Sequence, residues 1–271
     1  MQLPFLFFML LKAFITPGIG LNRIQAVHFQ EISMKNLHMK IKSHKKGQAT
    51  DRAKYITRTG KYAHYSDDLV ETGFGNLPAA ADGDPNKLWT SADKHERDNG
   101  SASREIEASL PNALSTEDQV AIVKEYIEQT GLGKPYQFAI HRPIGKLSQE
   151  DNSHFHLIYS DRLQDGIERP LDQMFRRYNP AAPENGGCKK GSGGKSPSTL
   201  RSEVQAKRKL MADIINAKME ERGLSERVDH RSLKDQGIKR APERYLGPGK
   251  VKNMTVEEKE AFVKERSAKK L

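Results

Sequence analysis

Two histidines separated by a single residue are the side chains of this sequence best placed to do chemistry. They lie in the segment 154–159, HFHLIY, whose aromatic and branched residues predict a β-strand. Because side chains alternate between the two faces of a strand, His154 and His156 project on one side and Phe155 and Leu157 on the other. Two imidazoles on one face can bind a metal ion, although most such pairs are ordinary half-buried residues.

A third histidine, His141, ends an earlier apolar segment, 138–141, and the polar residues that follow it predict a loop. If the two segments pair as a hairpin, the register decides whether His141 comes to lie opposite the HxH pair. Three neutral imidazoles with coordination positions left open suit a catalytic divalent metal better than a closed structural site. We therefore take His141, His154 and His156 as candidate metal ligands.

A pair of carboxylates lies on another predicted strand, 104–110, with sequence REIEASL. Alternation places Glu105 and Glu107 on one face and Ile106 on the other. Such a pair usually marks a solvated edge. If this face also carries the histidines, one glutamate can orient an imidazole or act as a general base.

The charge of the chain points to a polyanionic partner. Its 45 lysine and arginine residues exceed its 35 acidic residues by ten, and the pI is about 9.5. Nucleic acid is the first candidate for that partner, and a basic but otherwise ordinary soluble surface is the alternative. A single cysteine, Cys188, excludes a disulfide framework and a CxxC zinc site, and it fits a reducing cytosol.

Three tyrosines, Tyr55, Tyr62 and Tyr65, lie among arginines and lysines. Rings between cations suit single-stranded nucleic acid, because the rings stack on bases and the charges neutralise phosphates. Each tyrosine taken singly also fits half-buried packing. A non-catalytic nucleic-acid-binding module and a metal-dependent hydrolase therefore both remain open.

The remaining periodicity predicts an α+β chain. We expect a first strand at 36–42, helices at 88–99, 117–130, 200–222 and 255–270, and loops at 70–88 and 179–199. We divide the chain into an N-terminal extension (1–33), a core (34–179), a basic linker with a charged helix and a turn-rich region (180–249), and a polar tail (250–271). The helix at 200–222 is expected to extend a nucleic-acid contact from outside the core, so that a chain ending at Asn179 still folds.

The first 33 residues begin with an apolar run that is shorter than the roughly 20 residues a bilayer span requires and is not followed by a cleavage signal. No other stretch approaches that length. We expect translation to begin at Met34, and an N-terminal membrane anchor is the alternative.

Several separated stretches resemble the MobA/MobL-type plasmid mobilisation relaxases, which are members of the HUH endonucleases, and in particular those of IncQ-type plasmids. The stretches occur in the order found in that family and cover roughly residues 36–249. They are GQATDRAKYITRTGKYA, REIEASLP, FAIH followed by NSHFHLIYSDR, DGIERP with MFRRYNP and PENGG, and RVDHRSLKDQGI with LGP. The family often has Asn-Pro before its HxH pair, whereas this chain has Asn152-Ser153.

The resemblance implies a five-stranded antiparallel sheet flanked by helices, with the HxH strand central. It implies Tyr55 as the nucleophile, His141, His154 and His156 as ligands of Mg²⁺ or Mn²⁺, and an acidic strand, Glu105 and Glu107, beside the metal. The implied activity is nicking and rejoining of one DNA strand at an origin of transfer, with a rolling-circle replication initiator as the runner-up.

The implied partners are single-stranded origin DNA, relaxosome accessory proteins and a conjugative coupling protein, in the cytoplasm of a bacterium that carries the plasmid. The candidate phosphate contacts are Arg58, Lys61, Arg142, Arg176 and Arg177.

Overall fold

The computed structural model describes residues 33–130, 133–147, 149–242 and 246–268. Its centre is a five-stranded antiparallel sheet in the order β2-β4-β6-β5-β3, so that β6, the HxH strand, is the middle strand. The strands are β2 (Met39–Lys45), β3 (Leu69–Gly75), β4 (Ser101–Ser109), β5 (Tyr136–His141) and β6 (His154–Tyr159). The predicted α+β class and the central position of the HxH strand are confirmed.

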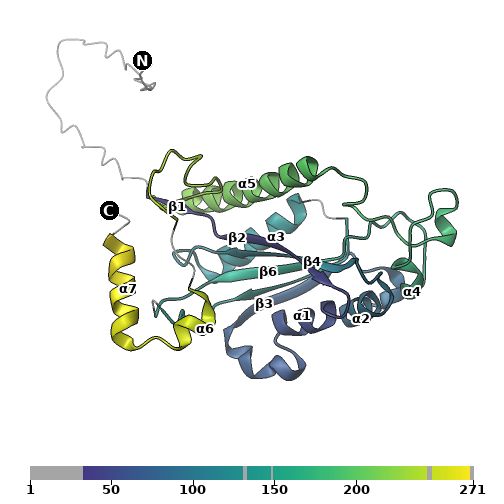
Figure 1. Cartoon of the computed structure of the whole chain (residues 1–271), viewed down its shortest axis with the longest axis horizontal. Helices are drawn as coiled ribbons and strands as arrows, with labels where there is room; N and C mark the ends of the chain where they lie inside the picture. The colour runs from purple at the N-terminus through teal and green to yellow at the C-terminus, as the bar shows by residue number, and fades with distance from the viewer. Residues whose placement is uncertain (1–32, 131–132, 148, 243–245, 269–271) are drawn as a thin grey trace, which may run out of the picture. The chain divides into compact units, whose positions relative to one another are not determined.

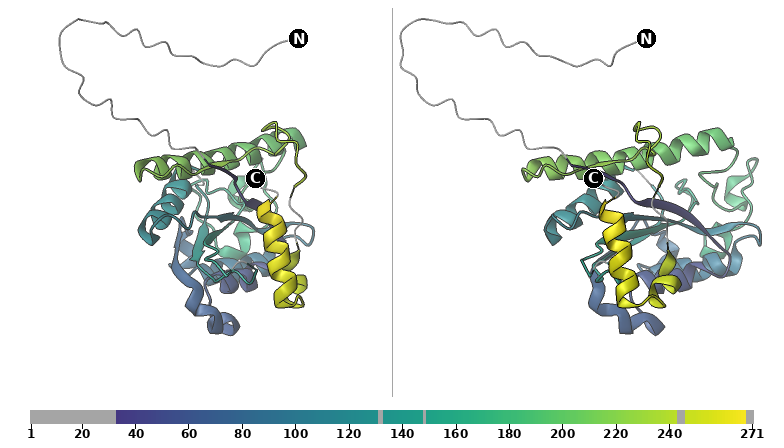
Figure 2. Two further views of the ribbon diagram at one scale, coloured as in Figure 1. Left: turned by 90° about the vertical axis from the view of Figure 1, so that its left-hand side faces the viewer. Right: turned by 60° about the vertical axis from the view of Figure 1, so that its left-hand side comes forward.

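Helices cover both faces of this sheet (Figure 1). On one face lie α3 (Thr116–Gln129) and α5 (Pro197–Glu221), which pack with Phe155 and Leu157 into the larger hydrophobic cluster. On the other face lie α1 (Ala49–Ile56) and α2 (Pro85–His95), whose apolar residues pack against Ala139 and Ile158. Figure 2 shows the same order of layers from two further directions. The alternation of β6 therefore buries its apolar residues under α3 and α5 and turns its histidines toward α1.

The start of α1 depends on a side chain from another helix. The backbone N–H groups of Ala49 and Thr50 donate to the two carboxylate oxygens of Asp93 on α2, at 2.9 and 2.8 Å. A carboxylate at a helix N-terminus satisfies donors that have no partner within the helix and interacts favourably with the helix dipole. Asp93 therefore fixes α1, and every residue on it, relative to α2.

The strand β3 falls within the segment predicted to be a loop, and that prediction is wrong. Gly73 and Gly75 interrupt its apolar pattern, but each lies beside an aromatic ring of β5, Phe138 and Tyr136 respectively. A Cβ on Gly73 would lie 2.6 Å from the ring of Phe138, and a Cβ on Gly75 would lie 2.5 Å from the hydroxyl oxygen of Tyr136. The rings fill the places where side chains of β3 would lie, a pairing that stabilises glycine in a sheet.

The helix α5 belongs to the core. Met211, Ile214, Ile215 and Met219 are buried in the larger hydrophobic cluster together with residues of β4, β5 and β6. The expectation that this helix lies outside the core is wrong, because its apolar residues gather in its second half, behind a highly charged beginning. A chain that ends at Asn179 would leave this cluster open, so we now expect it not to fold.

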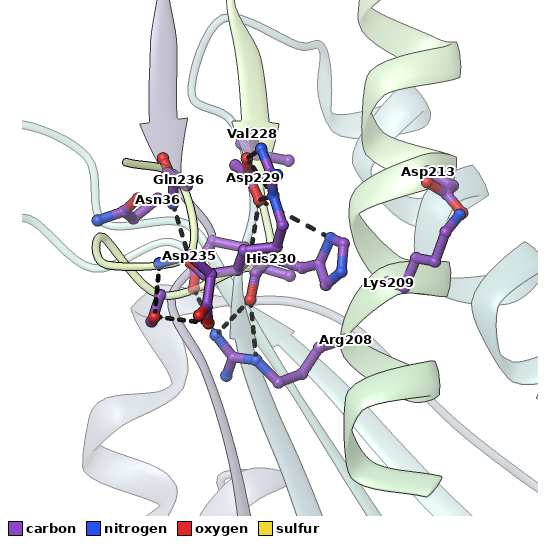
Figure 3. A network of polar contacts seen from close by, with 12 residues as sticks. Asn36, Arg208, Lys209, Asp213, Val228, Asp229, His230, Asp235 and Gln236 are labelled. Atoms are coloured by element: carbon purple, nitrogen blue, oxygen red, sulfur yellow. Dashed lines mark hydrogen bonds and ion pairs between the residues drawn. The ribbon is translucent and has the colours of Figure 1, made fainter. Parts of the chain in front are cut away.

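A second, two-stranded parallel sheet joins β1 (Met34–Asn36) to β7 (Arg227–Asp229). In Figure 3, Arg208 extends from α5 to this sheet, and its guanidinium donates to the carbonyl of His230. Gln236 also donates to Asn36 at 2.8 Å. Arg208 also donates to the Met39 carbonyl at 2.6 Å. The stretch RVDHRSLKDQGI, which carries part of the family resemblance, therefore packs on β1 and the start of β2 and stabilises them.

The remaining elements are short. They are η1 (Gly60–Asp68), η2 (Ala79–Ala81), α4 (Leu171–Met174), η3 (Pro183–Asn185), α6 (Gly247–Lys252) and α7 (Val256–Ala268). Among the described residues, no helix is both long and apolar enough to cross a lipid bilayer. The prediction that translation starts at Met34 concerns residues 1–33, and residues 1–32 lie outside the described residues.

Candidate active site

The pairing of β5 with β6 brings the three histidines together. His141 lies directly opposite His154, and Ala139 lies opposite His156. The ring centroids are 5.4 Å apart for His141 and His154 and 5.1 Å apart for each of the other two pairs. One nitrogen from each ring lies within 4.8 Å of the others. The triangle is therefore small enough for one ion to reach all three rings.

Hydrogen bonds determine which nitrogen of each ring keeps its lone pair. Nδ1 of His154 donates to the Asn152 carbonyl and Nδ1 of His156 to Glu105, each at 2.7 Å, which leaves Nε2 of both rings as an acceptor. In His141, Nε2 donates to the Ile56 carbonyl at 2.7 Å, and Nδ1 is the acceptor, to which the guanidinium of Arg58 donates at 3.3 Å. Each ring thus offers one unprotonated nitrogen, and this donor set fits a divalent metal ion.

Burial keeps the imidazoles of His141 and His154 neutral. It lowers the pKa of His141 to about 3, against the bond to the Ile56 carbonyl, which acts in the opposite direction. Burial also lowers the pKa of His154, again against a bond to a carbonyl. Both rings are therefore unprotonated at neutral pH, which is the state in which imidazole binds a metal.

The two glutamates have different surroundings. Glu105 is fully buried and receives bonds from Nδ1 of His156, from Nε2 of His44 at 2.7 Å and from Arg52. Burial opposes ionisation of Glu105, but the bonds from His156, His44 and Arg52 outweigh it and hold the pKa of this carboxyl well below its usual range. Glu105 is therefore an ionised group that holds the ring of His156.

Glu107 is more open than Glu105. Its side chain is 21% exposed and forms an ion pair with Lys42. One of its oxygens lies 4.0 Å from Nδ1 of His156. Burial opposes its ionisation, yet the bond from Lys42 lowers the pKa of Glu107. Glu105, Glu107 and His156 also form a second group of possible ligands, whose donor atoms lie within 4.8 Å of one another.

Tyr55 lies on α1 beside this cluster. Its ring centroid is 6.5 Å from that of His156, and two guanidinium groups lie against the ring, Arg52 at 4.5 Å and Arg58 at 4.7 Å. Tyr62 packs edge-on against Tyr55 at 5.2 Å, but its hydroxyl donates to Asp51. The structure therefore brings Tyr55 together with the three histidines.

Of the five candidate phosphate contacts, Arg58 lies against the histidine cluster. Arg58 is buried, and its guanidinium donates to both carboxylate oxygens of Asp68, to the Tyr55 carbonyl and to Nδ1 of His141, the last at 3.3 Å. Lys61 is exposed and pairs with Asp51 on α1. Arg142 follows His141 directly, but its guanidinium donates to Gln119 on α3, which covers the other face of the sheet.

The other two candidate contacts lie elsewhere. Arg176 and Arg177 are exposed and follow α4, close to the end of β6 that is remote from the HxH pair. The strand β6 ends at Tyr159, and at about 3.3 Å per residue the chain from His156 to Arg162 spans at most about 20 Å. The structure therefore does not bring these two arginines to the histidine cluster.

Two residues of the site, Arg52 and His44, are absent from the sequence-based set. Arg52 precedes Tyr55 by three residues, a spacing that places both on one face of a helix. His44 is on β2 and faces Glu105, which is 61 residues away in sequence. The helical spacing could have indicated Arg52, whereas nothing local indicates His44.

The family of the chain follows from its sequence. The model of the MobA/MobL family matches residues 36–256. The chain belongs to the MobA/MobL family. It is 38% identical over 209 residues to the 43 kDa relaxation protein of Salmonella typhimurium, covering 76% of this chain and 56% of that protein. It is 39% identical over 205 residues to mobilization protein A of Escherichia coli, covering 75% of this chain and 28% of that protein.

The chain thus spans about half, or less, of the length of these two MobA/MobL relatives. A solved structure described as the molecular basis of vancomycin resistance transfer in Staphylococcus aureus superimposes with a TM-score of 0.53. It shares 22% identity and covers 73% of this chain and all of that chain. At this level of identity the likeness shows the fold alone.

Proposed function

We propose that this member of the MobA/MobL family is the DNA-cleaving part of a plasmid mobilisation relaxase, which nicks one strand at an origin of transfer and rejoins it after conjugation. The observation that supports this most strongly is the position of Tyr55, whose ring is 6.5 Å from His156 within a cluster of three histidines. A phenol beside a metal site suits transfer of a phosphodiester to the protein. The names of the two relatives, a relaxation protein and a mobilization protein, agree with it.

The proposed reaction is an exchange of phosphodiesters. The phenolic oxygen of Tyr55 attacks the scissile phosphorus, a P–O bond to Tyr55 forms, and the bond to the 3′ oxygen breaks. The phenol loses its proton and the leaving oxygen gains one, which yields a 5′-phosphotyrosyl adduct and a free 3′-hydroxyl. Because the adduct keeps the energy of the broken diester, the reverse reaction rejoins the strand without ATP.

We assign the remaining roles from the surroundings of each side chain. Bound to His141, His154 and His156, Mg²⁺ or Mn²⁺ would supply positive charge for the scissile phosphate. The guanidinium groups of Arg52 and Arg58 lie 4.5 and 4.7 Å from the ring centroid of Tyr55 and position this ring beside the cluster.

Between the two glutamates, Glu107 suits the acceptor of the Tyr55 proton better. The oxygens of Glu105 are already used by His156, His44 and Arg52, so Glu105 positions the ring of His156. Glu107 has Lys42 as its bonded partner and retains exposure. Lys61, which pairs with Asp51 on α1, remains our candidate for a contact with a neighbouring phosphate, whereas Arg142 bonds Gln119 on α3 and is a weaker candidate.

A denaturing gel of the protein with a strand from a cloned origin of transfer of the same replicon tests the proposal. We expect an adduct that survives denaturation, requires a divalent cation, disappears with a chelator, and maps by mass spectrometry to the peptide containing Tyr55. Metal-dependent turnover without an adduct would instead indicate a hydrolase. Retardation of the strand without turnover would indicate a binding module.

A further inference from the structure

A cavity with a basic lining lies at the end of α2, away from the histidine cluster. Its volume is about 400 Å³. No acidic side chain is among the described residues that line it. They are Arg97, Arg162, Arg177, Tyr178, Lys189, Lys190, Gly193 and Gly194. Five cations and one aromatic ring thus face a single cavity.

One buried carboxylate, Glu96, offsets part of this charge. It is 1% exposed and pairs with Arg162 at 2.8 Å and with Lys190 at 3.1 Å. Nε of Arg97 lies 4.0 Å from it, and the Arg97 side chain is 56% exposed. Five cations against one carboxylate leave an excess of positive charge at the cavity, so an anion there would be favoured.

The wall of the cavity is fixed in place by Arg162. Its guanidinium donates to Glu96 and to the carbonyls of Phe175, Arg176 and Cys188, at 2.6 to 2.9 Å. The backbone N–H of Gly187 donates to the Arg177 carbonyl at 3.0 Å. A cavity held by such bonds is formed before a ligand arrives, which lowers the entropic cost of binding.

A basic edge connects this cavity with the histidine cluster. On β2, Lys42 lies opposite Glu105, and Lys45, three residues further on, lies opposite Ser101. The carbonyl of Ser101 accepts a bond from Lys190, which lines the cavity. Lys42, Lys45 and the neighbouring Lys46 therefore follow the edge of the sheet from the histidine cluster to the cavity, with Lys42 paired to Glu107 and Lys46 to Asp98.

We propose that this cavity binds a phosphate of the DNA strand at a distance from the cleaved bond, with the ring of Tyr178 available for a base. The proposal rests on the proposed function, which supplies DNA as the partner. Arginine and lysine neutralise strand phosphates and release counterions, and aromatic rings stack on bases of a single strand. The separation of at most about 20 Å corresponds to at most about six nucleotides of a B-form strand.

The double variant Arg97→Gln/Lys189→Gln tests this site. It removes two charges from the cavity and leaves Arg162 and Lys190 with their buried partner Glu96. We expect binding of a strand of about 25 nucleotides, followed by fluorescence anisotropy, to weaken about tenfold at low salt. The slope of log affinity against log salt should decrease by about 0.7, because the cavity is proposed to hold one phosphate and each phosphate contact on a single strand contributes about 0.7.

The matched control, Lys87→Gln/Lys124→Gln, removes the same charge from exposed side chains that do not line this cavity. It should keep the salt dependence of the wild type. Calorimetry with Mn²⁺ on all three proteins reports whether the histidine cluster stays folded in each. Irradiating a strand that carries 5-iodouracil, a base that couples to adjacent aromatic rings, is expected to label Tyr178.

The possible failures are distinguishable. Absence of an adduct from the wild type overturns the proposed function. A wild type that forms the adduct, with a cavity variant that binds as the control does, overturns the cavity proposal alone. Free dAMP presents the same phosphate chemistry, so binding of dAMP to the cavity as tightly as the strand would assign it to a nucleotide and overturn strand binding.

Discussion

Nδ1 of His156 and Oε1 of Glu105 lie 2.7 Å apart on neighbouring strands, and this bond fixes the ring that faces Tyr55. The same carboxylate accepts Nε of Arg52 at 2.8 Å, and the guanidinium of Arg52 lies against the ring of Tyr55. Glu105 therefore orients His156, a candidate ligand, and also binds Arg52, which lies against Tyr55, the candidate nucleophile. A carboxylate behind a ligand histidine selects its tautomer and strengthens its bond to a metal.

Replacing Glu105 with Gln should therefore weaken metal binding. The amide removes the charge that holds His156 and leaves the partly buried Arg52 without a charged partner. Loss of such a supporting group typically lowers metal affinity by about 10-fold to 100-fold. Calorimetry with Mn²⁺ measures the effect, and Glu107→Gln is the matched control, for which we expect a smaller loss. An equal loss in both variants would place the ion among Glu105, Glu107 and His156 instead of among the three histidines.

Replacing Tyr55 with Phe should abolish the covalent adduct and leave affinity for the strand nearly unchanged, because only the attacking oxygen is removed. Tyr62→Phe is the control, since the hydroxyl of Tyr62 is bonded to Asp51 at 2.8 Å. A denaturing gel reports the adduct, and anisotropy reports binding. If Tyr62→Phe is inactive and Tyr55→Phe still forms the adduct, the nucleophile is Tyr62.

The histidine cluster could be predicted from sequence because the three histidines lie on two strands that are neighbours along the chain. A period of two residues places His154 and His156 on one face, and pairing of the two neighbouring strands can bring His141 opposite them. The partners of Glu105 could not be predicted in this way. His44 and Arg52 are 61 and 53 residues from it in sequence, and only the order of the strands brings them together.

Two errors of prediction have different physical causes. The strand β3 was missed because the side chains that complete its surface, Phe138 and Tyr136, come from β5. The role of α5 was missed because the first half of this helix is highly charged, and its buried apolar residues are confined to the second half. A neighbouring element therefore supplies what the sequence of β3 lacks, whereas α5 contains its own apolar residues.

Shortening Ile215 on α5 to Ala should destabilise the whole protein, because the side chain is fully buried in the larger hydrophobic cluster between α5 and the sheet. Removal of a buried Ile side chain costs about 2–5 kcal/mol of unfolding free energy. Val204→Ala on the same helix is the control: Val204 is 38% exposed, and we expect a change within about 0.5 kcal/mol. Denaturant unfolding measures both. A negligible effect of Ile215→Ala would place α5 outside the cooperative core.

Acid should destabilise the protein in part through Asp161. This carboxylate is 3% exposed, accepts a bond from Lys134 at 3.1 Å and from Ser192, and lies 3.5 Å from Arg104. Burial opposes its ionisation, but the bond from Ser192 and the charges of Lys134 and Arg104 outweigh it and lower the pKa of Asp161. Because the folded carboxyl has the lower pKa, the unfolded chain binds more protons near the ordinary pKa of about 3.9. The stability that Asp161 contributes is therefore complete above that value and is lost as the pH falls through the lowered pKa of the folded state.

Asp161→Asn should accordingly be less stable than the wild type at neutral pH by about 2 kcal/mol, since it leaves buried partners without their charge. The difference between the two proteins should shrink as the pH falls below about 4, because protonation then removes the same charge from the wild type. Urea unfolding across this range measures it. Asp67→Asn, at an exposed position, is the control and should follow the wild type throughout. If Asp161→Asn and the wild type differ by a constant amount from neutral pH to acid, the carboxylate contributes through its shape and not through its charge.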